Sequence, residues 1–115
     1  MPQPGLLLAF SSPTDPSVTQ DAYNKWYTDI HIGDVVDSGL ADLAIRYKNL
    51  NPDARYQYLA IYRTPDLALL GDPETMKKVP TRHELFGGKD WTEVVDQRMR
   101  VWTQIQSFEG QGDGE

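Results

Sequence analysis

The order in which strand-like and helix-like hydrophobic patterns follow one another along the chain is the feature that most limits its possible folds. Residues 5–11 form a short, continuous apolar run that ends at Ser12-Pro13, which is typical of a buried strand followed by a turn. From residue 17 to residue 37 the pattern is that of an amphipathic helix, with a break expected near Gly33 and an end at Ser38-Gly39. Its apolar stripe repeats every four residues and consists of Val18, Ala22, Trp26 and Ile30, widened by Tyr23.

Two alternating strand patterns follow the helix, at residues 43–48 and 56–63, and the turn signal Asn51-Pro52 between them predicts a hairpin. A second helical region is expected over residues 66–79, interrupted at Asp72-Pro73. A loop at 80–88, a helical turn at 91–96 and a last strand at 97–108 complete the predicted elements.

The order strand, helix, strand, strand, helix, strand predicts an α+β fold, the ferredoxin-like βαββαβ arrangement with a four-stranded antiparallel sheet. Two helices can cover only one face of such a sheet, yet several strands are apolar on both faces. We therefore expect a homodimer in which two sheets pack face to face. One domain is expected over residues 1–109, followed by a disordered, acidic, Gly-rich tail at 110–115.

Composition narrows the classes of partner. The 11 Lys and Arg against 17 Asp and Glu give a net charge of −6, which disfavours nucleic acid and anionic membranes. Cysteine is absent, there are only two histidines, and no nucleotide-binding or metal-binding motif occurs. The apolar run at 6–10 is too short to span a membrane, and the start of the chain lacks the basic residues of a signal peptide. We expect a cytoplasmic protein without a cofactor or metal, whose partner is a hydrophobic small molecule.

Three residues of the long predicted helix form a candidate catalytic group. Tyr27, His31 and Asp34 are spaced i, i+4 and i+7, which places them on one stripe of a regular helix. Asp34 would accept a hydrogen bond from the imidazole, leaving the other ring nitrogen to take a proton, and Tyr27 would donate to a developing oxyanion. The alternative is a helix-end histidine beside a solvated carboxylate.

Further candidates lie in the loop and on the strands. His83, in the loop at 80–88, is a possible second acid or base, or simply an exposed loop histidine. Arg46 and Arg100 could bind a carboxylate, although arginines on strands more often lie at the surface or pair with acids such as Glu109. Five aromatic residues could line a pocket for a flat substrate, or could belong to the core and the dimer interface: Tyr47, Tyr58, Tyr62, Phe86 and Trp102.

The segment 24–36, Asn-Lys-Trp-Tyr-Thr-Asp-Ile-His-Ile-Gly-Asp-Val-Val, resembles the first-helix motif of EthD-like members of the dimeric α+β barrel superfamily. Segments 45–47 and 58–62 look like the next two strands of small fungal members, and 102–109 is similar to their last strand. Many relatives carry Pro where this chain has Gly33, and the loop before His83 has one extra residue compared with related polyketide cyclases.

The resemblance implies a wide range of activities, since the superfamily includes cofactor-free decarboxylases, cyclases, isomerases, anthrone-type monooxygenases and haem-degrading enzymes. We expect a cofactor-independent acid/base enzyme of polyketide-like or other secondary metabolism, a cyclase, isomerase or decarboxylase-type lyase acting on a hydrophobic carbonyl or phenolic molecule. His31 would be the base, held by Asp34, with Tyr27 and His83 acting on the substrate oxygen. The alternatives are an anthrone-type monooxygenase and a non-catalytic dimer that binds a small molecule.

Overall fold

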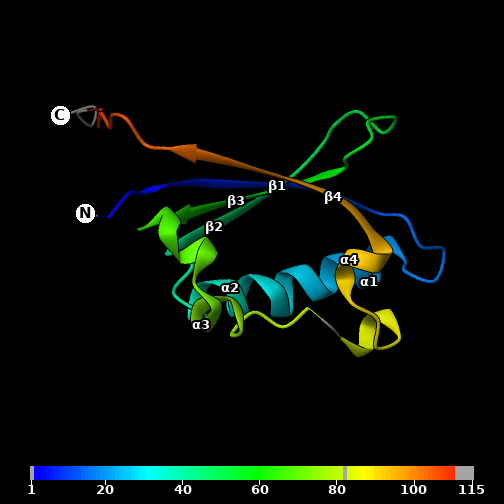
Figure 1. Ribbon diagram of the computed structural model, residues 1–115. Helices are drawn as coiled ribbons and strands as arrows, with labels where there is room; N and C mark the ends of the chain where they lie inside the picture. Colours follow the sequence, from blue (N-terminus) through cyan, green and yellow to red (C-terminus); the bar gives the residue numbers. More distant parts are fainter. Residues whose placement is uncertain (1, 82, 111–115) are drawn as a thin grey trace.

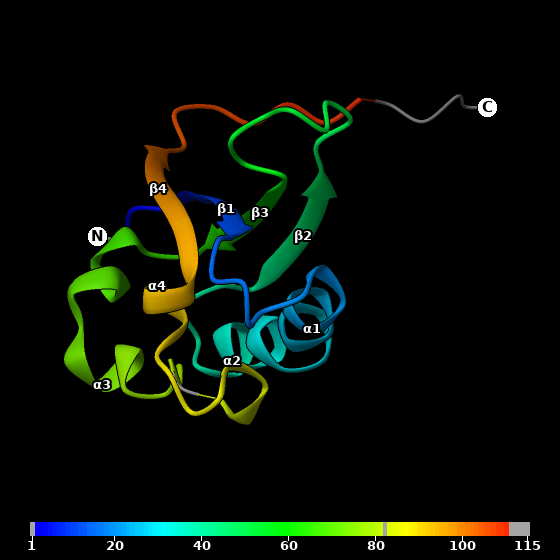
Figure 2. The same ribbon diagram turned by 90° about the vertical axis from the view of Figure 1, so that its right-hand side faces the viewer.

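The structure is a computed structural model, and it describes residues 2–81 and 83–110. A four-stranded antiparallel sheet forms one layer, and the helices form a second layer on one side of it (Figures 1 and 2). The spatial order β2-β3-β1-β4 is that of the ferredoxin-like arrangement, which confirms the predicted fold class. The strands are β1 (Gly5–Pro13), β2 (Leu43–Lys48), β3 (Tyr58–Thr64) and β4 (Val95–Thr103).

The predicted long helix consists of three consecutive segments. These are α1 (Gln20–Trp26), the π-helical turn η1 (Tyr27–His31) and α2 (Ile32–Asp37). Thr19 caps the start, because its hydroxyl accepts a hydrogen bond from the Ala22 N–H, and Gly39, with φ of 86°, follows the end. The break expected near Gly33 is wrong, since α2 runs through that residue. The irregularity lies earlier, where the Ile32 N–H donates to the Tyr27 carbonyl five residues before it.

The second helical region is shorter than the sequence pattern predicts. A 3-10 turn η2 (Leu67–Gly71) is capped by Asp66, and α3 (Pro73–Met76) follows the expected interruption at Asp72-Pro73. A further 3-10 turn, η3 (Glu84–Phe86), lies within the predicted loop. The short α4 (Trp91–Val94) begins with a capping box in which Asp90 and Glu93 each accept a backbone hydrogen bond from the other end of the turn.

The last strand ends before its predicted end at residue 108. Thr103 pairs with Gly5, the first residue of β1, so almost no backbone remains beside β4 for a longer ladder. Residues 104–110 leave the sheet and are called the C-terminal arm below. Of the tail predicted to be disordered, residues 111–115 lie outside the described part of the chain.

The two faces of the sheet differ in what covers them. On the inner face, toward the helices, Leu7, Ala9, Ala60 and Tyr62 are buried. The residues that alternate with them point to the outer face, which no element of the described chain covers (Figure 1). The outer face carries Leu6, Leu8, Phe10, Leu43, Ile45, Tyr47, Leu59, Ile61, Arg63, Arg98, Arg100 and Trp102. None of the helices among the described residues is long and apolar enough to cross a membrane.

Candidate functional site

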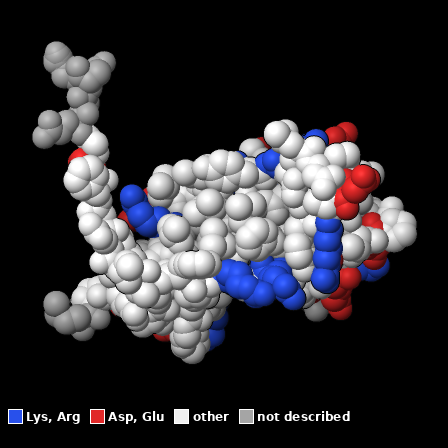
Figure 3. Space-filling view, turned by 90° about the horizontal axis from the view of Figure 1, so that it is seen from above, with Lys and Arg blue, Asp and Glu red and all other residues white. Residues whose placement is uncertain are grey.

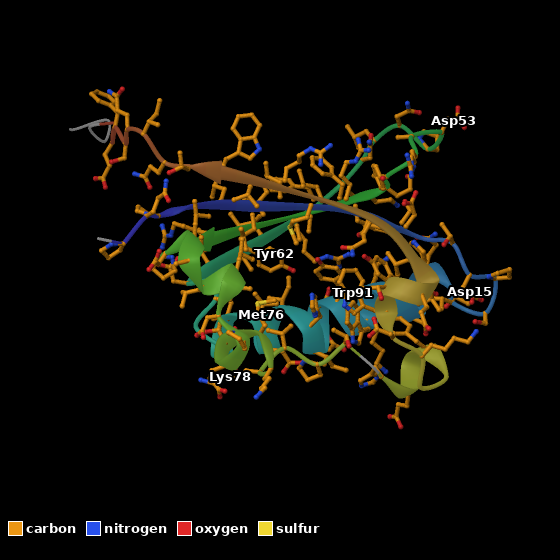
Figure 4. The ribbon with its side chains drawn as sticks, in the orientation of Figure 1. Asp15, Asp53, Tyr62, Met76, Lys78 and Trp91 are labelled. Atoms are coloured by element: carbon orange, nitrogen blue, oxygen red, sulfur yellow. The ribbon has the colours of Figure 1, made fainter. Side chains whose placement is uncertain are left out.

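A cavity of about 290 Å³ lies between the inner face of the sheet and the helical layer. Figure 4 shows how Tyr62 from β3, Trp91 from α4 and Met76 from α3 approach this space from different elements. The cavity is lined by Ala9, Tyr27, His31, Val35, Leu40, Tyr62, Met76, Val79, Thr81 and Trp91. Among the residues that the structure describes, no Lys, Arg, Asp or Glu belongs to this lining, which is apolar apart from a few neutral polar groups.

The imidazole of His31 is enclosed by aromatic rings. It stacks on Trp26, with ring centroids 4.4 Å apart and planes inclined by 18°. The edge of Tyr27 lies at 5.0 Å between centroids, and Trp91 at 5.7 Å. The π-helical turn is the cause of this placement, because its extra residue per turn directs His31, instead of Ile30, into the buried stripe.

The ring of His31 is uncharged at neutral pH in this environment. Burial, with a smaller contribution from the positive charge of Arg46, lowers the pKa of His31 to about 4. Nδ1 is buried and has no hydrogen-bond partner among the described residues. Most buried polar atoms in proteins are paired, so this ring nitrogen is an exception that calls for an explanation.

The sequence-based pairing of Asp34 with His31 is not found. Asp34 is half-buried on α2, and no hydrogen bond joins its carboxylate to the imidazole in the described part of the chain. The expected stripe assumed a regular α-helix, whereas the π-helical turn rotates His31 inward relative to α2. An orienting role for Asp34 therefore has no geometric support.

Tyr27 and Tyr62 form a buried hydroxyl pair in the cavity wall. The Tyr62 hydroxyl donates to the Tyr27 oxygen at 2.8 Å, so the proton of Tyr27 is available to a ligand. Burial raises the pKa of Tyr62 to about 12 and that of Tyr27 well above its usual value. Both phenols consequently stay protonated and act as hydrogen-bond donors at any ordinary pH.

Arg46 holds the long helix against β2 and does not line the cavity. Its guanidinium donates to Thr28 Oγ1 at 3.1 Å and to Asn24 Oδ1 at 3.0 Å. It also lies over the ring of Tyr27, with Cζ 4.3 Å from the centroid. Tyr58 belongs to the same contact region, since its hydroxyl donates to Gln20 Oε1 at 2.6 Å. These two predicted substrate-binding residues thus support the wall of the cavity from behind.

The other predicted site residues lie elsewhere. Phe86 is buried and packs edge-on against Trp26, whose ring also contacts His31, and it is not part of the cavity lining. His83 precedes η3, is half-buried and is not part of the cavity lining. Tyr47 and Trp102 are on the outer face, 50% and 61% exposed, so they do not line this cavity.

Several cavity residues were not anticipated from the sequence. Trp91 was assigned only to a helical turn, and Leu40 and Thr81 lie in segments predicted to connect the elements. Met76 and Val79 belong to the second predicted helical region and were given no role in a site. No local signal points them to His31, because each reaches the cavity through a turn whose direction depends on tertiary contacts. One such contact is the hydrogen bond from the backbone N–H of Trp91 to the backbone carbonyl of Thr81, at 2.7 Å.

Among the described residues, no cluster of three or more His, Cys, Asp or Glu is arranged to hold a metal ion. The polar lining residues include instead the buried Tyr27, Tyr62 and His31, whereas the hydroxyl of the lining residue Thr81 donates to Asp90 Oδ2 at 2.7 Å. This set can donate and accept hydrogen bonds but supplies no fixed charge.

Comparison with known proteins finds one informative relative. The chain is 49% identical over 78 residues to the protein named core atranone cluster (CAC) protein 1 from Stachybotrys chlorohalonatus (strain IBT 40285). The match covers 68% of this chain but only 33% of that protein, which is therefore about twice as long as this chain. No protein-family model matches the chain, and no solved structure matches it significantly. The resemblance to EthD-like proteins accordingly stays a prediction.

Proposed function

We propose that this protein is a cofactor-independent enzyme of fungal secondary metabolism that acts on an uncharged, hydrophobic molecule with a carbonyl or phenolic oxygen. The biosynthetic setting is supported by its relative, which is named for the atranone cluster. The substrate class is supported by the cavity, whose lining offers hydrogen bonds and apolar surface and, among the described residues, includes no Lys, Arg, Asp or Glu.

The observation that supports the proposal most is the placement of His31. A buried, uncharged imidazole lies in the cavity wall beside the Tyr27–Tyr62 hydroxyl pair. A ligand carbonyl could accept a hydrogen bond from the Tyr27 hydroxyl. The hydrogen bond that Tyr62 donates to Tyr27 polarises the Tyr27 hydroxyl and would strengthen this contact with the ligand. The oxygen of the ligand is then held by a preformed hydrogen-bond donor.

The proposed chemistry is proton transfer next to that carbonyl. As the C–H bond breaks, its electron pair forms an enolate whose oxygen is stabilised by Tyr27, and the proton passes to a nitrogen of His31. With a pKa of about 4, His31 is a weak base in the empty cavity. The negative charge that develops on the enolate favours the imidazolium and raises its pKa during the transfer. Return of the proton to a different carbon completes an isomerisation. Alternatively, the enolate carbon attacks a second carbonyl of the same molecule, whose oxygen takes the proton in a cyclisation, or a β-hydroxyl leaves with the proton as water in a dehydration.

The low pKa of His31 also favours a second candidate, a non-catalytic protein that binds the same class of molecule. In that case His31 and Tyr27 only complete hydrogen bonds to the ligand. The third alternative, an anthrone-type monooxygenase, would use the same deprotonation but consume oxygen during turnover.

Hydrogen–deuterium exchange of 2-tetralone, an uncharged fused-ring ketone with acidic C–H bonds, tests the proposal. The protein is expected to accelerate exchange in deuterium oxide, and His31→Gln to reduce the acceleration about 100-fold or more, the scale of one positioned acid or base. His83→Gln is the matched control, since it changes the other histidine of the chain and leaves the cavity lining intact.

Binding is measured in parallel through the fluorescence of Trp26 and Trp91, in a Trp102→Phe background that removes the exposed indole of the outer face. Binding of 2-tetralone without accelerated exchange would favour the non-catalytic candidate. The absence of both binding and accelerated exchange would contradict the assignment of the cavity. An equal loss of exchange in both histidine variants would contradict it as well.

We also propose that the protein forms a homodimer through the outer face of the sheet. Apolar residues from β1, β2 and β4 are exposed there, among them Leu6, Leu43, Ile45 and Trp102, and Leu59 and Ile61 of β3 are half-buried between them. A native mass of twice 13.0 kDa is expected. A monomer at micromolar concentration would contradict this.

A further inference from the structure

We propose that Arg98 and Arg100, on the outer face of β4, form a docking site for the C-terminal arm of a second copy of this chain. The inference rests on the proposed homodimer and adds an exchange of arms between the two copies. The arm, residues 104–110, would lie across the sheet of the partner, with its acidic end beside the two arginines.

The two arginines lie in an aromatic groove and form no ion pair with any described residue. Their side chains are two positions apart on β4, so both point to the outer face, opposite Phe10 and Leu8 of β1. A groove of about 350 Å³ is lined by Leu8, Phe10, Tyr56, Arg98, Arg100 and Trp102. The nearby carboxylate of Asp96 is already engaged, since it pairs with Arg55 at 2.7 Å.

This arrangement is unusual in so acidic a protein. With 17 acidic residues against 11 basic ones, two arginines that form no ion pair among the described residues can take a negatively charged group supplied from elsewhere, although the charge of Asp96 already interacts with Arg98. In Figure 3, which looks onto the outer face, Lys and Arg gather along part of a broad uncharged surface, whereas Asp and Glu lie mainly at one end. The surface thus combines apolar contact area with localised positive charge.

The arm has the complementary composition. Ile105 and Phe108 are 92% and 89% exposed. Burial of two large apolar side chains against another surface is favourable, because it removes apolar area from water. Glu109 follows them, is exposed, and has no ion pair in the described part of the chain. Apolar residues followed by a carboxylate match a groove in which aromatic rings border two guanidinium groups.

The arm is also placed so that it can reach a partner. It leaves the end of β4 and rises from the outer side of the sheet in Figure 1, where together with Leu6 and Leu8 it borders a second groove of about 460 Å³. Two sheets packed face to face lie ~10 Å apart. Seven extended residues span up to about 25 Å, enough to cross that distance and continue along the partner's strands.

Charge reversal in two complementary variants tests the exchange. The first variant carries Arg98→Glu and Arg100→Glu, and the second carries Glu109→Arg. Each alone brings like charges together in its own dimer, so each is expected to weaken dimerisation at least about tenfold, as read from native mass spectrometry over a dilution series. The matched controls are Lys78→Glu and Asp29→Arg, exposed charges on the helical side, which should leave the dimer unchanged.

Mixing the two variants distinguishes exchange from a contact within one chain. In a mixed dimer each arm meets a face of opposite charge, so the heterodimer is expected to regain the affinity of the unmodified protein. Equal weakness of the mixed and separate samples would overturn the exchange, because a contact within one chain is not repaired by mixing. Dimers that are insensitive to all three reversals would overturn the docking site and leave the sheet-to-sheet dimer intact.

A monomeric unmodified protein would overturn the dimer and the exchange together. The cavity assignment would be unaffected, because its lining comes from a single chain. A truncated chain that lacks residues 104–115 provides a further test. It should dimerise as weakly as the charge-reversal variants, and circular dichroism should show that its fold is retained. Saturable binding of 2-naphthoate to the unmodified protein, lost in the Arg98→Glu and Arg100→Glu variant without any change in dimer affinity, would instead assign the groove to an anionic small molecule.

Discussion

The imidazole of His31 stacks on the indole of Trp26, with 4.4 Å between ring centroids and 18° between planes. This contact exists because a π-helical turn at Tyr27–His31 interrupts an otherwise regular helix and rotates the histidine into the core. The same turn places Tyr27 next to the histidine and both beside the cavity. Insertions of this kind occur often at functional sites, and this one assembles the candidate site.

The first prediction concerns the protonation of His31. Its imidazole should titrate with a pKa of about 4, because burial disfavours the charged form. Asp34→Asn should leave this pKa unchanged, since no hydrogen bond joins the two side chains. The measurement is a nuclear magnetic resonance titration of the two imidazoles. A pKa near 7 for His31 that falls on replacing Asp34 would restore the pairing expected from the sequence.

The second prediction follows from the difference between the folded and unfolded protonation of His31. Its pKa is about 4 in the folded protein against 6.5 in the unfolded chain, so between these pH values the unfolded chain binds more protons. The free energy of unfolding should therefore rise as pH increases from 4 to 6.5, by roughly 3 kcal/mol at most, and level off above. Urea unfolding across this range measures the slope. His31→Gln should flatten it, and an equal slope in both proteins would exclude His31 as its cause.

The third prediction concerns the hydroxyl pair of Tyr27 and Tyr62. Tyr62→Phe removes the donor of a buried hydrogen bond and should lower the free energy of unfolding by about 1 kcal/mol. A double-mutant cycle with Tyr27→Phe should show coupling of similar size. Tyr47→Phe is the control, because this half-exposed tyrosine of the outer face should tolerate the change with no measurable loss. Additive effects in the cycle would mean that the two hydroxyls do not interact.

The fourth prediction is that Arg46 stabilises the fold and does not bind the ligand. Arg46→Met removes hydrogen bonds to Thr28 and Asn24 and the contact over Tyr27, which together should cost about 2–3 kcal/mol of stability. Arg46→Lys should recover only part, because an ammonium group does not reproduce the fork of the guanidinium. Lys48→Met, an exposed residue of the same strand, is the control. If Arg46→Met unfolds like the unmodified protein but binds 2-tetralone more weakly, Arg46 acts on the ligand instead.

The fold followed from the sequence because each element has its own periodicity. The continuous apolar run of β1, the alternation in β3 and the four-residue repeat of Val18, Ala22 and Trp26 are local properties, and their order leaves few arrangements of the sheet. The predicted end of β4 lies too far along the chain. The alternation of side chains continues beyond Thr103, whereas the partner strand β1 does not extend beyond Gly5, which pairs with Thr103.

The site was predicted only in part, for a physical reason. Tyr27, His31 and Tyr62 line the cavity as expected, but the inserted residue of the π-helical turn has no clear sequence pattern and separates His31 from Asp34. Aromatic residues of the inner and outer faces also look alike in sequence. Tyr62 and Tyr47 both alternate with apolar neighbours, and only the position of the helices decides that one is buried and the other is half-exposed.

If an uncharged oxygenated ligand binds beside His31, the two imidazoles of the chain should respond to it differently. The measurement is a titration of the unmodified protein with 1-naphthol, followed through the imidazole resonances of His31 and His83. We expect a saturable shift of the His31 resonances, with those of His83 unchanged and the whole response lost when Trp91→Ala opens the cavity wall. A shift confined to His83, or to residues of the outer face, would contradict it.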